Sequence, residues 1–286
     1  MNRNKRHISS NPDNGDFFDK VTIPYQKNKE EVWAALSSRL EEPYKPKTIH
    51  LFSYRPAMAI AAALLALVAL FSVMRFYTTN ITCPAGQHLT VSLPDGSSVE
   101  MNAGSVLKYR PFWWWASRDL RFEGEGFFKV QKGSAFRVRS CRGQTTVLGT
   151  TFNIFSRDET YKVTCFTGKV KVTSKTKEEV ILGPGYSAQV IESGKIIVRK
   201  EKMPEATVSW MDNMFNFTAA PLAEVMKEVE RQYGVTISME PGLIFYYTGF
   251  FSKEKPVEEV LSIICKPFGI TYVKTADGSY KIISNP

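Results

Sequence analysis

The residues best suited to chemistry, the histidines and cysteines, are few and widely spaced in this chain. No two histidines lie near each other, and the four cysteines include no C-x-x-C spacing of the kind used by zinc sites and thioredoxin-like redox motifs. A disulfide between two of the cysteines suits an exported compartment, but buried free thiols are the preferred interpretation. The sequence therefore predicts no metal site, no catalytic triad and no cofactor. The residues concerned are His7, His50, His88, Cys83, Cys141, Cys165 and Cys265, with Cys141 and Cys165 as the candidate pair.

Two glutamates and three tryptophans are the best candidates for carbohydrate chemistry. Glu123 and Glu125 would project from the same side of a strand, as a glycosidase pair must, although a solvated strand face is the preferred interpretation. Trp113, Trp114 and Trp115 are consecutive and offer a sugar-stacking platform, a partner-binding knob, a contact with a bilayer, or core filling. In a strand, at most two of the three could share a surface. The alternative function is therefore a membrane-anchored periplasmic carbohydrate-binding or carbohydrate-cleaving protein.

Length and composition describe a folded protein with a modest positive charge. The chain has 286 residues, of which 43% are hydrophobic, and it carries 37 Lys and Arg against 28 Asp and Glu, a net charge of +9. This much apolar material excludes disorder and collagen-like repeats, and the length favours about two folded units. The excess charge is spread along the chain, so we expect no direct contact with nucleic acid.

One apolar segment divides the chain. From Ala57 to Met74 there is no charged residue, and 18 helical residues at 1.5 Å each reach about 27 Å, close to the hydrocarbon thickness of a bilayer. We predict an uncleaved transmembrane helix over residues 56–75, in preference to a buried core helix or a signal peptide. The positive-inside rule places the N-terminus in the cytoplasm and the C-terminus in the periplasm, across the inner membrane. The flanking basic residues are Lys45, Lys47 and Arg55 before the segment and, after Arg75, none until Lys108.

The preceding segment, residues 1–55, holds one helical pattern. Asn28 and Glu31 have the spacing of a capping arrangement, and Pro43 predicts the end of the helix. A single short amphipathic helix is marginal alone in water, so its apolar stripe needs a protein partner, the membrane face or the chain's own earlier apolar residues. The predicted stripe is Val32, Trp33, Leu36 and Leu40, and the earlier residues are Phe17, Phe18, Val21 and Ile23.

Two further patterns follow the apolar segment. Over residues 80–200 apolar residues alternate with polar ones between recurrent glycine turns, which predicts an all-β domain without a long helix. Over residues 208–286 a repeat appears: 221–225 is matched by 256–260, and 234–237 by 269–272, at an offset of 35. Each unit predicts strand, helix, strand, so we expect a small duplicated α/β domain whose exposed sheet edge could accept a partner strand.

The β segment carries a set of motifs in order: Gly86-Gln87, Leu93 to Ser97, Asn102 to Ser105, Leu120 to Val130, Phe136-x-Val138, Val147 to Ile154 and Thr167 to Val170. In these motifs the chain resembles the FecR family of anti-sigma factors. The terminal repeat resembles the α/β domain of Bacteroidetes-type members, which is related in plan to the secretin and TonB short N-terminal domain. The residues that carry the family motif are Asp95, Gly96, Gly124, Glu125, Phe128, Gly149, Thr150, Phe152 and Gly168.

The resemblance implies a non-enzymatic role in cell-surface signalling and transcription regulation. A cytoplasmic segment would hold an extracytoplasmic-function (ECF) sigma factor, and the periplasmic region would receive a signal from a TonB-dependent outer-membrane transporter. Because a lone spanning helix transmits conformational change poorly, we expect regulated cleavage in or near the membrane to release the sigma factor. Some family members cleave themselves at a Gly-Thr motif, here Gly149-Thr150, where the Thr150 hydroxyl would attack the preceding carbonyl. A glycine required by a bulge before a buried strand is the preferred interpretation.

Overall fold

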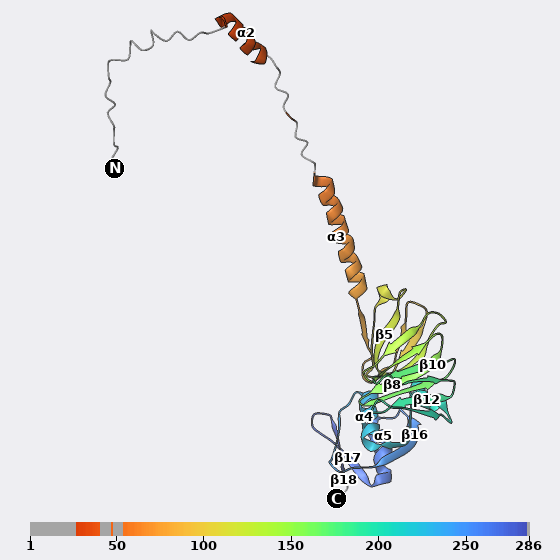
Figure 1. Ribbon diagram of the computed structural model, residues 1–286. Coiled ribbons are helices and arrows are strands. Elements are labelled where there is room, and N and C mark those ends of the chain that lie inside the picture. The colour runs from red at the N-terminus through yellow and green to blue at the C-terminus, as the bar shows by residue number, and fades with distance from the viewer. Residues whose placement is uncertain (1–26, 41–46, 48–53, 285–286) are drawn as a thin grey trace, which may run out of the picture. The chain divides into compact units, whose positions relative to one another are not determined.

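The computed structural model describes residues 27–40, 47 and 54–284, and the chain divides into two compact units, residues 1–61 and 62–286. The first unit contains the helix α2, Lys29–Leu40, and the beginning of α3, Tyr54–Phe76 (Figure 1). His7, His50, the early apolar residues Phe17 to Ile23 and the predicted helix end at Pro43 lie outside the described residues.

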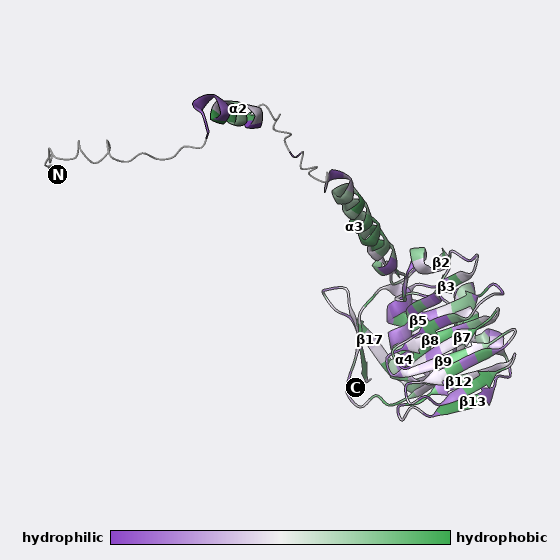
Figure 2. Ribbon diagram, turned by 45° about the horizontal axis from the view of Figure 1, so that its top comes forward, coloured by the Kyte–Doolittle hydropathy of each residue, from purple (hydrophilic) through white to green (hydrophobic). Residues whose placement is uncertain are grey.

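The helix α3 contains the whole of the predicted apolar segment. It has 23 residues, and no residue of its apolar stretch is buried. Figure 2 shows most of the helix in green, with hydrophilic purple at its two ends. Alanine and leucine favour the helix, and β-branched Thr78 and Thr79 follow its end, where the first strand begins. Within the described part of the chain, α3 is the one helix long and apolar enough to cross a membrane, consistent with a single-pass anchor.

The β region consists of thirteen strands in one sheet that is bent into two layers. The long strand β5 belongs to both layers, because its first half pairs with β4 and β6 and its second half with β3 and β8. The strands are β1 Thr79–Thr82, β2 Leu89–Ser92, β3 Ser98–Met101, β4 Val106–Tyr109, β5 Arg118–Lys129, β6 Phe136–Arg139, β7 Gly143–Val147, β8 Thr151–Arg157, β9 Thr160–Cys165, β10 Val170–Ser174, β11 Glu179–Leu182, β12 Tyr186–Val190 and β13 Ile196–Lys200.

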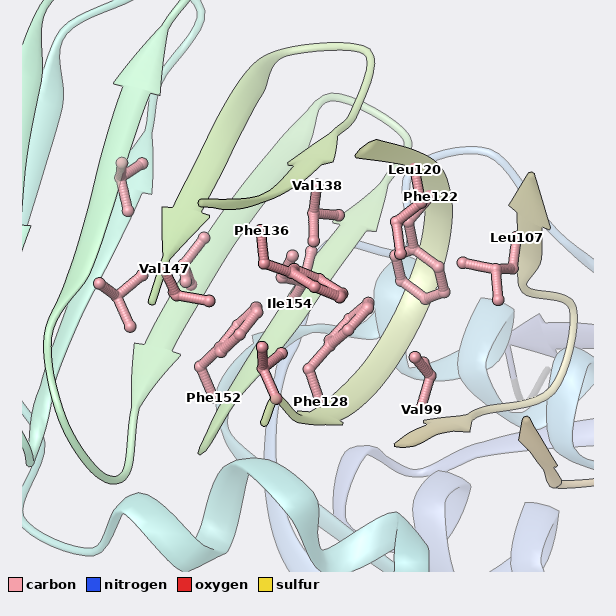
Figure 3. Close-up of a cluster of buried hydrophobic side chains, with 14 of the residues drawn as sticks. Val99, Leu107, Leu120, Phe122, Phe128, Phe136, Val138, Val147, Phe152 and Ile154 are labelled. Atoms are coloured by element: carbon pink, nitrogen blue, oxygen red, sulfur yellow. The ribbon is translucent and has the colours of Figure 1, made fainter. Parts of the chain in front are cut away.

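The apolar side chains of alternate strand positions fill the space between the two layers. The rings of Phe128 and Phe152 are stacked with centroids 5.0 Å apart, and Phe122 meets Phe128 edge-on at 5.2 Å. Figure 3 shows these rings pointing toward one another between the strands. Each is fully buried, so this cluster supplies the main hydrophobic stabilisation of the β region.

The bend of β5 depends on Gly124. Its φ of +116° is one that side chains rarely adopt, and a Cβ there would lie 2.6 Å from the Cα of Ser105. The Ser105 hydroxyl in turn donates to the Glu125 carbonyl and accepts from the Glu125 N–H, both at 3.0 Å. Only glycine therefore allows the strand to pass this close to Ser105 as it changes layers.

The C-terminal region shows the order strand, helix, strand twice. Pro221 and Pro256 directly precede α4, Leu222–Tyr233, and α5, Val257–Cys265, as the repeat predicts. Gly234 ends α4 with a φ of +67°. The remaining elements are the 3₁₀ segments η2 Pro204–Asp212 and η3 Lys266–Phe268, and the strands β14 Met214–Pro221, β15 Ile237–Met239, β16 Tyr246–Ser252, β17 Ile270–Lys274 and β18 Tyr280–Ser284, which form a two-stranded sheet β14-β16 and a three-stranded sheet β15-β18-β17.

This region has a hydrophobic core of its own. The predicted stripe of α4 is buried, and in α5 three of the four stripe residues are buried while Val257 is half-buried. Both helices pack on the two small sheets. The residues of the two stripes are Leu222, Val225, Met226, Val229, Val257, Val260, Leu261 and Ile264.

The tryptophan run differs from its strand-based prediction, and one of the four cysteines differs from the predicted burial. Pro111–Trp113 form a 3₁₀ turn, η1, so strand parity does not apply to the run; Trp114 is buried and Trp115 is exposed. All four cysteines are free, three of them buried as the preferred interpretation requires. Cys141 is exposed, because it lies in the turn between β6 and β7.

Candidate functional site

The predicted sigma-binding residues lie on α2 with their apolar groups in solvent. Trp33 is 71% exposed, Leu36 50% and Leu40 76%, and Val32 is half-buried. At 100° per residue these four positions lie on one side of the helix, as their helical spacing in the sequence predicts. The structure thus brings the four residues together in the first unit.

The start of α2 falls where the sequence predicts it. The Asn28 carbonyl accepts a hydrogen bond from the Val32 N–H at 3.1 Å, which makes Asn28 the residue before the first helical turn. Two acidic residues, Glu30 and Glu31, occupy that first turn and favour the positive end of the helix dipole. The predicted side-chain bonds between Asn28 and Glu31 are not among the hydrogen bonds of the described residues.

The Gly149-Thr150 motif is packed tightly between loops. A Cβ at Gly149 would lie 2.8 Å from the Cα of Lys132, and one at Gly168 would lie 3.0 Å from the Thr150 hydroxyl oxygen. Thr150 is 3% exposed and its hydroxyl donates to the Lys169 carbonyl at 3.2 Å. Gly149 and Gly168 are therefore explained by the close approach of neighbouring atoms, which leaves no room for a side chain. The Thr150 hydroxyl is bonded to a neutral carbonyl, which is not a general base.

The Asp95-Gly96 turn holds a buried ion pair. Asp95 accepts from Arg118 at 2.8 Å, from the Ser97 N–H at 3.1 Å and from the Ser97 hydroxyl at 2.9 Å. Burial alone would raise the pKa of Asp95, but the hydrogen bonds from Arg118 and Ser97 outweigh it, and the pKa is lowered. The Arg118 side chain is 7% exposed and also donates to the carbonyls of Gln131 and Ser134. The motif turn therefore ties the start of β5 to two neighbouring loops.

Glu125 lies in a buried polar cluster, which we define as Asn102, Glu125, Asn153, Glu228 and Gln232. Its carboxylate accepts from the side-chain amides of Asn102 at 2.9 Å and Asn153 at 3.2 Å. Burial, together with the nearby charge of Glu228, raises the pKa of Glu125 to about 7 despite the lowering effect of Arg157. The β region therefore contains a buried carboxyl group whose pKa lies close to neutral pH.

The buried polar cluster joins the β region to the C-terminal region. Gln232 on α4 donates to the Asn102 side-chain oxygen at 2.6 Å and to Glu228 at 2.9 Å. Beside the cluster, Lys253 donates to the Gly86 carbonyl at 3.0 Å. Other bonds across the same interface are those of Gly86 N–H to the Arg231 carbonyl and of Lys227 to Asp158, together with the ring contact of His88 with Trp210.

A cavity of about 520 Å³ opens along this interface. Positively and negatively charged side chains line the cavity: Arg157 and Glu125 from the β region, and Glu228 and Lys253 from the C-terminal region. Trp210 of the C-terminal region also lines it. The described residues contain no group of three metal-ligating side chains. The arrangement is suited to holding two folded regions in register.

The sequence predicted part of this interface incorrectly. The preferred interpretation placed both Glu123 and Glu125 on a solvated strand face; Glu123 is exposed, but Glu125 is covered by the C-terminal region. Gln232, His88 and Asn102 were not singled out for binding. One signal existed for Gln232, because it continues the stripe of Val225 and Val229 at the three-residue spacing of α4, where a polar residue implies a buried partner.

Comparison with known proteins agrees with this architecture. The family model described as "FecR protein" matches residues 79–171, and the model "FecR, C-terminal" matches residues 214–283. Two crystal structures of a putative anti-sigma factor from Parabacteroides distasonis are similar, each with 30% identity over 73% of this chain and 100% of that chain, with TM-scores of 0.67 and 0.66. No match is found among curated proteins.

The two-layer β region and the small α/β region that follows it correspond to the two matched family segments and to the similar crystal structures of an anti-sigma factor, so the class of protein is regulatory. The chain belongs to the FecR family of anti-sigma factors. Its general partner is accordingly a sigma factor.

Proposed function

We propose that this anti-sigma factor sequesters an ECF sigma factor through α2 and responds to a TonB-dependent outer-membrane transporter through its C-terminal region. The observation that carries the proposal is the apolar stripe of Trp33, Leu36 and Leu40, which is solvent-exposed on a helix separated from the folded β region by α3. An exposed tryptophan and two leucines on one helix side are typical of a helix that binds in a groove.

In the proposed topology α3 crosses the inner membrane once. The tail of residues 1–55 lies in the cytoplasm, residues 56–75 span the bilayer, and the segments 80–200 and 208–286 lie in the periplasm as a β domain and a duplicated α/β domain. The support is Lys47 before α3 and Arg55 in its first turn, together with the absence of any Lys or Arg between Arg75 and Lys108.

The periplasmic partner is proposed to be the signalling domain of the transporter. Tyr246 and Phe250 lie on the same side of β16 and are 65% and 63% exposed, and Ile244 just before the strand is 81% exposed. Apolar side chains gathered on one strand favour protein contact. Regulated cleavage in or near the membrane would then release the tail with its sigma factor.

Co-purification of the full chain with the candidate ECF sigma factor tests the cytoplasmic half. The double variant Trp33→Asp with Leu36→Asp should abolish sigma retention, since two charges would replace the centre of the stripe. The matched control, Ala34→Asp with Ser38→Asp, adds the same charge on the opposite side of α2 and should retain the sigma factor. Unchanged retention by the Trp33/Leu36 variant would show that α2 is not the binding helix.

A further inference from the structure

The turn Pro111–Trp115 presents two large aromatic side chains to solvent. Trp115 is 81% exposed and Phe112 49%. The turn itself is rigidly held, because Trp114 is 4% exposed and packs edge-on against Tyr109 at 5.6 Å and Phe136 at 5.7 Å in the β core. Because the buried Trp114 fixes the turn, the fold holds Phe112 and Trp115 outside the core in a defined position.

The same turn contacts the last turns of α3. The Trp113 ring meets Phe71 edge-on with centroids 5.4 Å apart, and the Arg75 guanidinium lies 4.8 Å from the centre of the Trp113 ring. Tyr77, just after the helix, meets Phe112 at 5.4 Å. These contacts all lie within the second compact unit, residues 62–286.

The position of Phe71 on the helix sets the depth of the turn. Phe71 precedes the helix end at Phe76 by five residues, which corresponds to about 7 Å along the axis at 1.5 Å per residue. The 23 residues of α3 reach about 34 Å, slightly more than a hydrocarbon core of about 30 Å. Trp113 therefore lies at the level where a spanning helix leaves the hydrocarbon, which is where tryptophan is enriched in membrane proteins.

Unpaired cations lie beside the aromatic turn. Lys108 on β4 is directly opposite Arg121 on β5, and Arg110 follows Lys108 by two residues in an extended conformation, so all three project from the same side of the sheet. All three are exposed, and none of them forms an ion pair with any described residue. The neighbouring Arg137 and Arg139 differ, because Asp119 neutralises part of their charge.

We propose that the aromatic turn and the cations Lys108, Arg110 and Arg121 form a second, peripheral membrane contact, in which Phe112 and Trp115 enter the interface of the bilayer and the cations bind the headgroups of anionic phospholipids. A membrane is the expected partner of this surface for two reasons: the aromatic turn contacts α3, which is proposed to span the bilayer, and the three cations complement the negative charge of anionic headgroups. The inference rests on the proposed function in one respect, that α3 spans a membrane. Its consequence is that the β region is held against the membrane surface at a fixed side, instead of being tethered through α3 alone.

The test is spin-label accessibility on the full chain in nanodiscs of phosphatidylcholine with and without phosphatidylglycerol. In a Cys141→Ser background, whose other cysteines are buried, Ala116→Cys places the label in the turn and leaves every aromatic residue intact. Ala276→Cys is the matched control in the exposed β17-β18 turn, and Val68→Cys reports on α3. The readout is collision of the label with oxygen, which partitions into lipid, and with a water-soluble nickel chelate.

We expect the label at position 116 to collide several-fold less with the nickel chelate than the label at 276, while remaining open to oxygen. Trp115→Ser should reverse most of this protection. Lys108→Glu with Arg121→Glu should weaken it in discs that contain phosphatidylglycerol, and the control Lys175→Glu with Lys195→Glu, which changes exposed loop lysines, should not.

Four outcomes would overturn the proposal. A label at 116 as open to nickel as the one at 276, with position 68 still in lipid, refutes the peripheral contact and leaves the spanning helix intact. Protection at 116 from both probes would show a protein cover, such as a second copy of this chain. Protection that is unaffected by charge reversal at Lys108 and Arg121 would refute the headgroup contact. Nickel access at position 68 would instead refute the span itself, and the inference with it.

Discussion

The carboxyl group of Glu125 should make the stability of the folded region depend on pH, and Glu125→Gln should remove that dependence. The ordinary pKa of a glutamate is 4.5, and burial raises that of Glu125 to about 7. Since the folded state holds the proton more tightly than the unfolded chain, the free energy of unfolding is greatest below about pH 4.5. It falls as the pH rises from there to about 7, and it is level above that.

The size of the effect follows from the displacement of the pKa. Each unit corresponds to about 1.4 kcal/mol, so the full change is about 3 kcal/mol. For a folded region of about 200 residues, this corresponds to roughly 6–12 °C in melting temperature. In Glu125→Gln the side chain stays neutral, but one of its amide hydrogens faces the donors of Asn102 or Asn153, which costs about 1 kcal/mol at every pH.

Thermal unfolding of the full chain in detergent, followed by tryptophan fluorescence between pH 5 and pH 8.5, measures this difference. The variant should be less stable than the wild type at pH 5 and more stable at pH 8.5. Comparison of the two proteins cancels the contribution of His88, whose pKa is lowered by burial and by Lys253. A stability difference that is the same at all pH values would refute the assignment of a raised pKa to Glu125.

Three further variants test the motif residues. Asp95→Ala should lower the free energy of unfolding by about 1.5–3 kcal/mol, because the buried Arg118 would lose its charged partner and keep its bonds to the carbonyls of Gln131 and Ser134, and chemical denaturation measures it. Gly124→Ala should cost at least about 1–3 kcal/mol from its backbone angle alone, with the overlap on Ser105 added; near wild-type stability would contradict the close approach at the bend of β5. Immunoblotting of the intact chain should give one band, and two periplasmic fragments that disappear in Thr150→Ala would instead demonstrate cleavage.

The fold was predictable where one local pattern determined it. Alternation places Phe136 and Phe152 inside the β region, and the three- and four-residue spacing of Leu222 and Val225 places them inside the C-terminal core. Both patterns depend only on which side of an element faces away from water. The aromatic turn lacks such a pattern, because Pro111 fixes a 3₁₀ turn that interrupts strand parity.

The buried polar cluster was not predictable, because its residues come from four parts of the chain and satisfy one another only after both cores have formed. Glu125 shows the difficulty: its strand position predicts solvent, but Asn102 and Asn153 bind its carboxylate, and Gln232 of α4, more than ninety residues later in the chain, binds Asn102 in turn. The junction between the two regions therefore differs from their hydrophobic cores. A hydrogen bond such as that from Gln232 to Asn102 requires a specific distance and direction, which a hydrophobic contact does not. A junction of this kind holds the two regions in one register.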